Sequence, residues 1–206
     1  MHEPEGPFGE FTGYASYRST ENVFVAKRVS MRKDATFHSI ASGMSADHLV
    51  TLAMSREAEI RNTLQRPLPN VTGVHVPLNT AGALTAVIGM RKIEEGQPRQ
   101  AIMTALGTDP YVKCAVVVDD DVDIFNLSDV MWAMSTRVHA EEDIVFIPGA
   151  MGFILDPASH PETHTVTKVG IDATKLKGRD FAACLVISEE QRARVRAIME
   201  RAGIRL

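Results

Sequence analysis

Two glutamates near the start of the chain lie in a loop that could hold both carboxylates over one substrate. Glu5 and Glu10 stand five residues apart in the run Glu-Gly-Pro-Phe-Gly-Glu-Phe-Thr-Gly-Tyr, which ends at Tyr14. The glycines allow backbone geometry closed to other residues and the proline fixes one φ angle, so neither a helix nor a central strand is expected here. Two neighbouring carboxylates titrate apart, so that one can carry a proton near neutral pH and act as a general acid. From the spacing alone, a turn with two solvated glutamates remains the commoner explanation.

A second group of acids follows an apolar run. Asp119 to Asp123 read Asp-Asp-Asp-Val-Asp directly after the apolar residues 114–118, and the carboxyl end of a strand is where α/β proteins place functional loops. These acids could bind Mg²⁺ or Mn²⁺, as in metal-dependent sugar-nucleotide transferases. They could instead cap a helix beginning at Ser128, with Arg137 pairing to the acidic loop, and this structural interpretation is the one we favour. Trp132, on the same helix, fits a core position better than a cofactor site.

Other common site patterns are missing from the sequence. The seven histidines have no zinc-binding spacing, and no glycine-rich phosphate loop occurs. The two cysteines, Cys114 and Cys184, lie in apolar segments and are predicted to be buried thiols without a catalytic role.

Predicted strands and helices alternate along most of the chain, which indicates a mixed α/β domain. The predicted helices are 55–64 with Ser55 as cap, 98–106 closed by Gly107, 128–138, and 188–202 ended by Gly203. The predicted strands are 71–76, 84–90, 113–118, 144–147 and 181–187. Two further β-branched runs, 23–29 and 35–40, are predicted to be strands of a barrel or sheet that begins elsewhere.

Composition limits the classes of protein that need be considered. With 206 residues and 45% hydrophobic content, the chain can form one substantial core, or one domain plus a fragment of another. A net charge of -4 without a basic stripe argues against nucleic acid or an anionic membrane as the main partner. No apolar run reaches the roughly 18 residues of a membrane span, and the first residues lack signal-peptide character, so a cytoplasmic location is predicted.

Taken together, the motifs resemble the UbiD-like carboxy-lyase family, whose members are decarboxylases that use prenylated FMN. The resemblance covers nearly the whole chain and specifically its C-terminal portion, because family members are usually more than twice as long. The matching segments, in the order the family has them, are residues 5–14, 116–123, 132–137, 155–159 and 168–174.

The resemblance implies a fold and a pair of catalytic residues. Residues 1–42 would be the remnant of a flavin-binding split β-barrel, its last strands together with the catalytic Glu loop, and 43–206 the mixed-sheet α/β C-terminal domain of the UbiD type with a terminal helix. Glu10 matches the family's proton donor, and Glu5 matches the partner that forms an ion-pair network with an arginine. That arginine, and the groups that hold the flavin phosphate, Mn²⁺ and K⁺, would lie mainly in the N-terminal part absent from this chain. No metal ligand is assigned among the residues present.

His48 and Arg56 are candidates for binding the substrate. An arginine offers a fixed fork of donors that suits a carboxylate. Family members that decarboxylate furan or pyrrole acids are similar here, with a His and an Arg at this spacing near the substrate. The alternative is a surface histidine and a helix arginine paired with Glu57 or Glu59.

Phe153 and Leu155 are candidates for the wall of the substrate pocket. They belong to the glycine-broken apolar segment 148–155, which is too irregular for one strand and could line a small-molecule site. By resemblance, both fall where family members line the substrate pocket. Plain core packing remains an equally open interpretation.

These observations predict the C-terminal part or subunit of a prenylated-FMN-dependent decarboxylase of aromatic, heteroaromatic or α,β-unsaturated carboxylic acids. Such a chain would need an N-terminal flavin-binding half or subunit as partner and would have little activity alone. A homo-oligomer formed through the C-terminal domain is also expected by resemblance. The competing hypothesis is a non-catalytic assembly subunit that packs on neighbouring chains through its amphipathic last helix.

Overall fold

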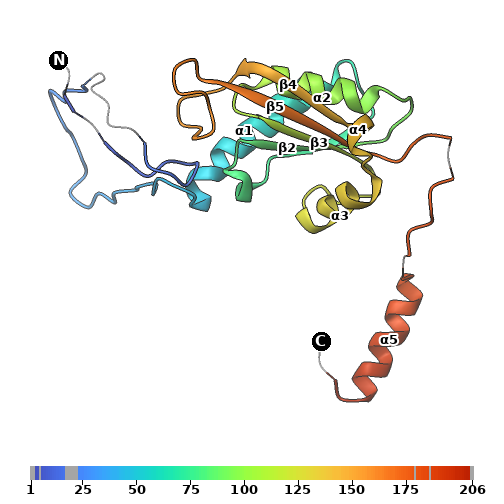
Figure 1. Cartoon of the computed structure of the whole chain (residues 1–206). Helices are drawn as coiled ribbons and strands as arrows, with labels where there is room; N and C mark the ends of the chain where they lie inside the picture. Colours follow the sequence, from blue (N-terminus) through green and yellow to red (C-terminus); the bar gives the residue numbers. More distant parts are fainter. Residues whose placement is uncertain (1–2, 5, 17–22, 179, 186, 205–206) are drawn as a thin grey trace. The chain divides into compact units, whose positions relative to one another are not determined.

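The centre of the computed structural model is a five-stranded mixed sheet with the strand order β1-β2-β3-β5-β4 (Figure 1). Residues 3–4, 6–16, 23–178, 180–185 and 187–204 are described. The strands are β1 (Val71–His75), β2 (Thr85–Met90), β3 (Cys114–Asp119), β4 (Ile144–Met151) and β5 (Thr165–Ala173). The helices are α1 (Ala46–Gln65), η1 (Leu78–Thr80), α2 (Gln97–Thr108), α3 (Leu127–Arg137), α4 (Ala140–Asp143) and α5 (Glu189–Arg201).

The three central strands are parallel and the two outer strands antiparallel. β2 pairs with β3 and β3 with β5 in parallel, while β1 and β4 close the edges in antiparallel register. Central strands covered on both faces need continuous apolar runs, which β2 and β3 supply. Pro148 lies in the edge strand β4 beside a register shift, a position where its missing N–H disturbs no inner ladder. The fold is therefore the mixed-sheet α/β class predicted from the sequence.

Helices cover both faces of the sheet. On one face α1 and α2 pack through residues such as Ile60 and Ile102 against Ile88 and Val117, all of them fully buried. On the other face α3 packs through Val130 and other buried residues against β2, β3 and β5. Figure 1 shows α1 and α2 on the side of the sheet opposite α3. The two faces together remove the central strands from water.

Several predicted elements differ from the observed ones. The first helix begins after Ser45, not Ser55, whose hydroxyl instead donates to the Leu52 carbonyl one turn earlier, a bond that serine makes inside helices. Asn126, not Ser128, caps α3, because its side chain accepts the Ser128 N–H. The strand β5 is not among the predicted strands, although its residues include the matching segment 168–174.

The predicted strands at 23–29, 35–40 and 181–187 do not form in the described residues. These runs have suitable composition, but no described strand lies beside them to pair with, and Phe24 and Phe37 are each 91% exposed. The prediction for Cys184 is also wrong, because that thiol is exposed. Cys114 lies half-buried in β3, and burial raises the pKa of its thiol.

The chain forms two units, residues 1–175 and 176–206. The second contains α5, whose start has the predicted capping arrangement: the Ser188 hydroxyl accepts the Gln191 N–H while the Gln191 side chain accepts the Ser188 N–H. Among the described residues, no helix is both long and apolar enough to cross a bilayer.

Candidate active site

Glu10 lies in a tight loop closed by its own backbone. Its N–H donates to the Tyr14 carbonyl at 2.8 Å, and the Gly13 N–H returns to the Glu10 carbonyl at 2.9 Å. Gly13 has a φ of 83°, a left-handed conformation that favours glycine, and a Cβ there would lie 2.8 Å from the Met44 sulfur. The loop therefore fixes the backbone of a half-buried Glu10. Glu5 lies outside the described residues, so its pairing with Glu10 stays a prediction.

An aromatic cluster anchors this loop to the α/β domain. Phe11, next to Glu10, is only 6% exposed and stacks on Phe153 with 5.8 Å between ring centroids. Phe153 in turn contacts Tyr111 at 4.4 Å, and Leu155 packs in the same cluster. The structure thus brings Phe153 and Leu155 together beside the Glu10 loop, although both residues are more than 140 positions from Glu10 in the sequence. Aromatic contacts of this kind add about 1 kcal/mol each to the burial of the rings.

Of the two candidate substrate-binding residues on α1, Arg56 adjoins this cluster directly and His48 only through its neighbour Leu49. The residue after His48, Leu49, is buried among the cluster side chains, while His48 Nδ1 lies 3.0 Å from the Gly43 carbonyl oxygen. Arg56 lies over the ring of Tyr111, with 4.4 Å from its guanidinium carbon to the centroid. Arg56, Phe153 and Leu155 therefore adjoin one aromatic cluster, whereas the His48 side chain contacts Gly43, outside that cluster.

Arg56 pairs with neither glutamate considered from the sequence. Its Nε lies 3.1 Å from Asp109 Oδ2, in a pair whose side chains are 12% and 7% exposed. Glu57 instead accepts from the Val76 N–H at 2.8 Å and lies 2.8 Å from His75 Nδ1. Sequence reasoning missed Asp109 and Tyr111, because both lie in the short connection between α2 and β3 and no motif marks them.

A buried ion pair holds the segment that carries Leu155. The Lys113 ammonium donates to both carboxylate oxygens of Asp156, at 2.8 and 2.7 Å, and the Asp156 side chain is only 1% exposed. Asp156 Oδ1 also accepts the Ala158 N–H. The start of β3 thereby fixes the loop between β4 and β5, and with it one wall of the aromatic cluster.

The acidic run after β3 is occupied by protein cations. Arg137 donates to Asp119 at 2.8 Å and to both oxygens of Asp121, at 2.9 and 3.1 Å. The Lys175 ammonium bonds Asp121 at 2.7 Å, and its backbone N–H bonds Asp119. Within the described part of the chain, no three metal-ligating side chains come together. The pairing with Arg137 agrees with the structural interpretation of this run, but the predicted cap of the helix is wrong, because Asn126 caps α3. The observed pairs give the hypothesis of a metal-dependent transferase no support.

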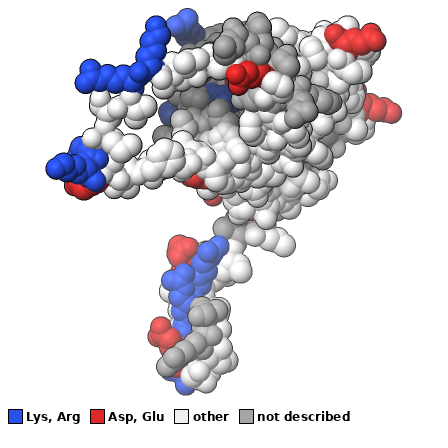
Figure 2. Space-filling model, turned by 90° about the vertical axis from the view of Figure 1, so that its left-hand side faces the viewer, with Lys and Arg blue, Asp and Glu red and all other residues white. Residues whose placement is uncertain are grey.

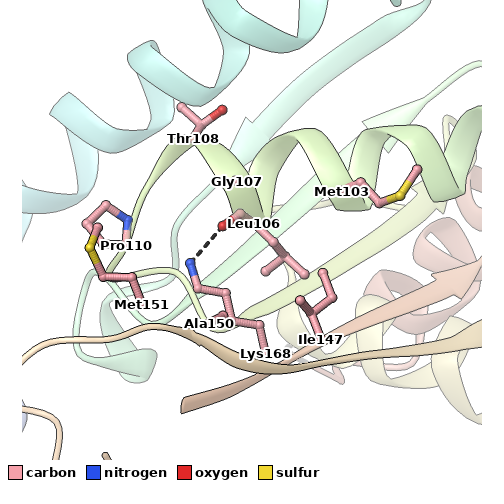
Figure 3. Close-up of a pocket in the computed structure, with 9 residues that line it drawn as sticks. All are labelled: Met103, Leu106, Gly107, Thr108, Pro110, Ile147, Ala150, Met151 and Lys168. Carbon is pink, nitrogen blue, oxygen red and sulfur yellow. Dashed lines mark hydrogen bonds between the residues drawn. The ribbon is translucent and has the colours of Figure 1, made fainter. Parts of the chain in front are cut away.

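A cavity of about 330 Å³ lies near the C-terminal end of α2 (Figure 3). Ala150 and Met151 line it, but Phe153 and Leu155 do not, so the glycine-broken segment divides between this cavity and the aromatic cluster. At its wall, the buried Lys168 ammonium donates to the carbonyls of Leu106 and Asp109, at 2.7 and 2.9 Å. Burial lowers the pKa of Lys168, and the charge of Asp109 opposes that shift.

One polar atom in the Glu10 loop has no partner in the described structure. The Thr12 hydroxyl oxygen is fully buried and makes no hydrogen bond there. A buried hydroxyl without a hydrogen-bond partner lowers stability by about 1–3 kcal/mol, so a donor or acceptor that reached this atom would stabilise the loop. A polar-edged group such as the flavin that the resemblance implies would have to supply that partner from outside the described residues.

Comparison with known proteins places these observations in a family. The 3-octaprenyl-4-hydroxybenzoate carboxy-lyase C-terminal domain matches residues 49–173, and the Rift-related domain of the same enzyme matches residues 1–45. The anhydromevalonate phosphate decarboxylases of Methanothermobacter thermautotrophicus and Methanocaldococcus jannaschii are 35% and 33% identical to 84% and 86% of this chain.

Solved structures give the same result. The UbiD-class enzyme HmfF from Pelotomaculum thermopropionicum, in complex with FMN, is similar over 92% of this chain at 33% identity, with a TM-score of 0.85. An open form of Sedimentibacter hydroxybenzoicus vanillic acid decarboxylase is similar over 98% of the chain at 27% identity, with a TM-score of 0.82. The chain spans 41–44% of the length of these four relatives. By domain match, sequence identity and fold, it belongs to the UbiD-like carboxy-lyase family.

Proposed function

We propose that this chain is the C-terminal part of a prenylated-FMN-dependent decarboxylase in which Glu10 donates the proton. The observation that supports the proposal is the packing of the Glu10 loop. Through Phe11 that loop rests on Phe153 and Tyr111, so the backbone of the proposed acid adjoins the predicted pocket wall. A catalytic acid beside an apolar aromatic wall is the arrangement that a flat unsaturated acid requires.

The proposed substrates are aromatic, heteroaromatic or α,β-unsaturated carboxylic acids. Relatives include a decarboxylase of vanillic acid, which is aromatic, and decarboxylases of anhydromevalonate phosphate. The apolar wall and the Arg56 donors suit any acid that combines a flat carbon skeleton with a carboxylate.

Each residue of the site has a distinct task in this proposal. The prenylated flavin, when bound, supplies the electron sink for the loss of CO₂. Glu10 holds a proton on its carboxyl group and delivers it to the carbon that has lost CO₂. Phe11, Tyr111 and Phe153 exclude water from that carbon, and Arg56 binds and orients the acid.

A flavin-binding partner is part of the proposal, because the described residues form one side of a site. Apolar side chains between positions 24 and 40 are more than half exposed, and these are Phe24, Val25, Val29, Met31, Phe37 and Ile40. Such exposure is unusual for a free surface and typical of a segment that packs on further polypeptide. On the face in Figure 2, the Lys and Arg side chains form separate groups with uncharged surface between them.

The test replaces Glu10 by glutamine in the enzyme assembled with its flavin-binding part. Glu10→Gln keeps the shape and removes the acid, so turnover should fall at least a hundredfold while the visible spectrum of the bound flavin is unchanged. Decarboxylation is followed by CO₂ release from 4-hydroxybenzoate, vanillate, 2-furoate and crotonate. Wild-type rates in the variant would remove Glu10 from the mechanism.

Assembly is a second candidate function, carried by the exposed apolar face of α5. Val195 and Ile198 are 52% and 53% exposed and lie three residues apart, on one side of the helix. The proposed occupant is α5 of a second copy of this chain. Val195→Glu with Ile198→Glu should lower the mass in sedimentation velocity, whereas the control Arg196→Glu should not. An unchanged mass in the double variant would exclude this face as the contact.

A further inference from the structure

Asp109 and Arg56 form a buried pair beside the candidate site. Asp109 is 6% exposed and follows the last residue of α2, and Arg56 lies within α1. The 3.1 Å separation of Arg56 Nε from Asp109 Oδ2 joins the two helices at this point. Because an uncompensated buried guanidinium is costly, Asp109 is the group that allows Arg56 to be buried here.

The carboxylate of Asp109 is itself held firmly. Its Oδ1 accepts the Tyr111 N–H at 2.7 Å, and its backbone carbonyl accepts the Lys168 ammonium at 2.9 Å. Lys168 belongs to β5 and is 3% exposed, so the sheet fixes the backbone of Asp109. Contacts from both sides of the aspartate therefore restrict it to one arrangement.

Tyr111 fixes the plane of the Arg56 guanidinium. The ring lies 4.4 Å from the guanidinium carbon, and it also contacts Phe153, whose centroid is 4.4 Å from its own. The Arg56 Nη1 donates to the Leu52 carbonyl at 3.2 Å. No hydrogen bond of Nη2 is formed within the described residues, so the outer edge of the guanidinium keeps donors for an acceptor from outside.

We propose that Asp109, assisted by the ring of Tyr111, is a positioning residue that holds Arg56 in the one orientation in which its outer N–H groups bind the carboxylate of the substrate. This inference rests on the proposed function, because the substrate acid is what Arg56 would bind. Asp109 itself does not touch the substrate. The pair is electrically balanced before the acid arrives, so orientation rather than net charge provides the gain in binding.

The direction of the change in KM separates positioning from simple charge compensation. In the assembled enzyme, Asp109→Asn keeps the size of the side chain and removes its charge. If Asp109 positions Arg56, the KM for the acid should rise about tenfold with little change in kcat, since a charge-assisted hydrogen bond to the substrate is lost. If Asp109 only offsets the charge of Arg56, its removal should strengthen attraction to the acid and lower KM.

The experiment measures kcat and KM with whichever of 4-hydroxybenzoate, vanillate, 2-furoate or crotonate the wild-type enzyme turns over fastest. Asp121→Asn is the matched control, because it neutralises the partner of the other buried arginine, Arg137, and should leave KM unchanged. In an Arg56→Met background, Asp109→Asn should have no further effect on KM. A purely structural role of Asp109 would persist in that background and overturn the proposal.

A second pair of variants tests the ring. Tyr111→Leu removes the surface under the guanidinium and should raise KM about threefold, whereas Tyr111→Phe keeps that surface and should not. Crystal structures add a readout that needs no turnover: Arg56 should hold one rotamer in the wild type and in Asp121→Asn, and several in Asp109→Asn. A single unchanged rotamer in Asp109→Asn would contradict the proposal.

The two proposals fail in different ways. Full activity in Glu10→Gln would overturn the proposed function whatever Asp109 does. An inactive Glu10→Gln combined with a wild-type KM in Asp109→Asn would overturn only the positioning role.

Discussion

Two arginines in this domain have the same kinds of neighbour and differ in how many of their donors are used. Arg56 lies 4.4 Å from the ring centroid of Tyr111 and beside Asp109, and Arg137 lies 5.0 Å from that of Trp132 and beside Asp121. Arg137 contacts both oxygens of Asp121 and one of Asp119, and its side chain is 1% exposed.

The difference indicates which arginine is structural. Both Nη atoms of Arg137 are bound to carboxylates, while its fully buried Nε makes no hydrogen bond within the described residues, so a further anion would meet two carboxylates already in place. Arg56 has one carboxylate partner, one backbone acceptor and an outer edge that makes no hydrogen bond within the described structure. An arginine whose two Nη groups are both bound to carboxylates fastens the sheet end to α3, whereas an arginine with an Nη group left over is suited to receive a ligand.

The strongest test of this comparison replaces each arginine by methionine and measures unfolding in urea. Arg137→Met leaves two carboxylates without their main partner at the end of β3, and the loss should be about 3 kcal/mol. Arg56→Met should cost only about 1 kcal/mol, because Asp109 keeps its Tyr111 N–H bond and lies near the Lys168 charge. Methionine retains the apolar stem in both variants, so packing is matched.

The same two variants should show the reverse order in catalysis. In the assembled enzyme, Arg56→Met should raise the KM for the acid more than Arg137→Met does, because only Arg56 adjoins the aromatic cluster. If Arg56→Met and Arg137→Met lost the same stability and had the same KM, the two arginines would have the same role. The distinction between a structural and a ligand-binding arginine would then be wrong.

Parts of this molecule were predictable because they depend on neighbours in sequence. The apolar runs of β2 and β3 and the capping arrangement at Ser188 are local patterns, and all were found in place. The Glu10 loop was recognisable from its glycines and proline, which constrain the backbone whatever surrounds them. Likewise, Arg137 and the acidic run lie within 20 positions of one another and were expected to pair.

The remainder of the site depends on contacts between distant segments. Asp109 and Arg56 are 53 positions apart in the sequence. The residues around Asp109 connect a helix to a strand, and their sequence has no feature that distinguishes it from an ordinary connection. Tyr111 and Phe153 meet only because β3 and the loop before β5 are neighbours in the folded sheet. Conversely, residues 23–40 have the composition of strands but pair with no strand among the described residues, and strand formation needs a second strand as well as suitable residues.

A smaller effect should appear in the pH dependence of the Arg137 cluster. Burial raises the pKa of Asp121, but hydrogen bonds and charges from Arg137 and Lys175 outweigh it and hold the pKa below its ordinary value of about 3.9. Because the folded-state pKa is the lower one, the contribution of Asp121 to stability is present above about pH 4 and is lost as pH falls through the folded-state pKa.

Asp121→Asn should therefore be less stable than the wild type at pH 7, by less than about 1 kcal/mol, because the Asp121 side chain is 39% exposed. The difference in unfolding free energy should stay constant from pH 7 to 5 and shrink as pH falls below about 4. Asp120→Asn is the control, because its partner Arg91 is 74% exposed and the change should have little effect. A difference for Asp121→Asn that grew as the pH fell would mean that its carboxylate opposes folding, and Arg137 would then lack the stabilising two-oxygen partner that distinguishes it from Arg56.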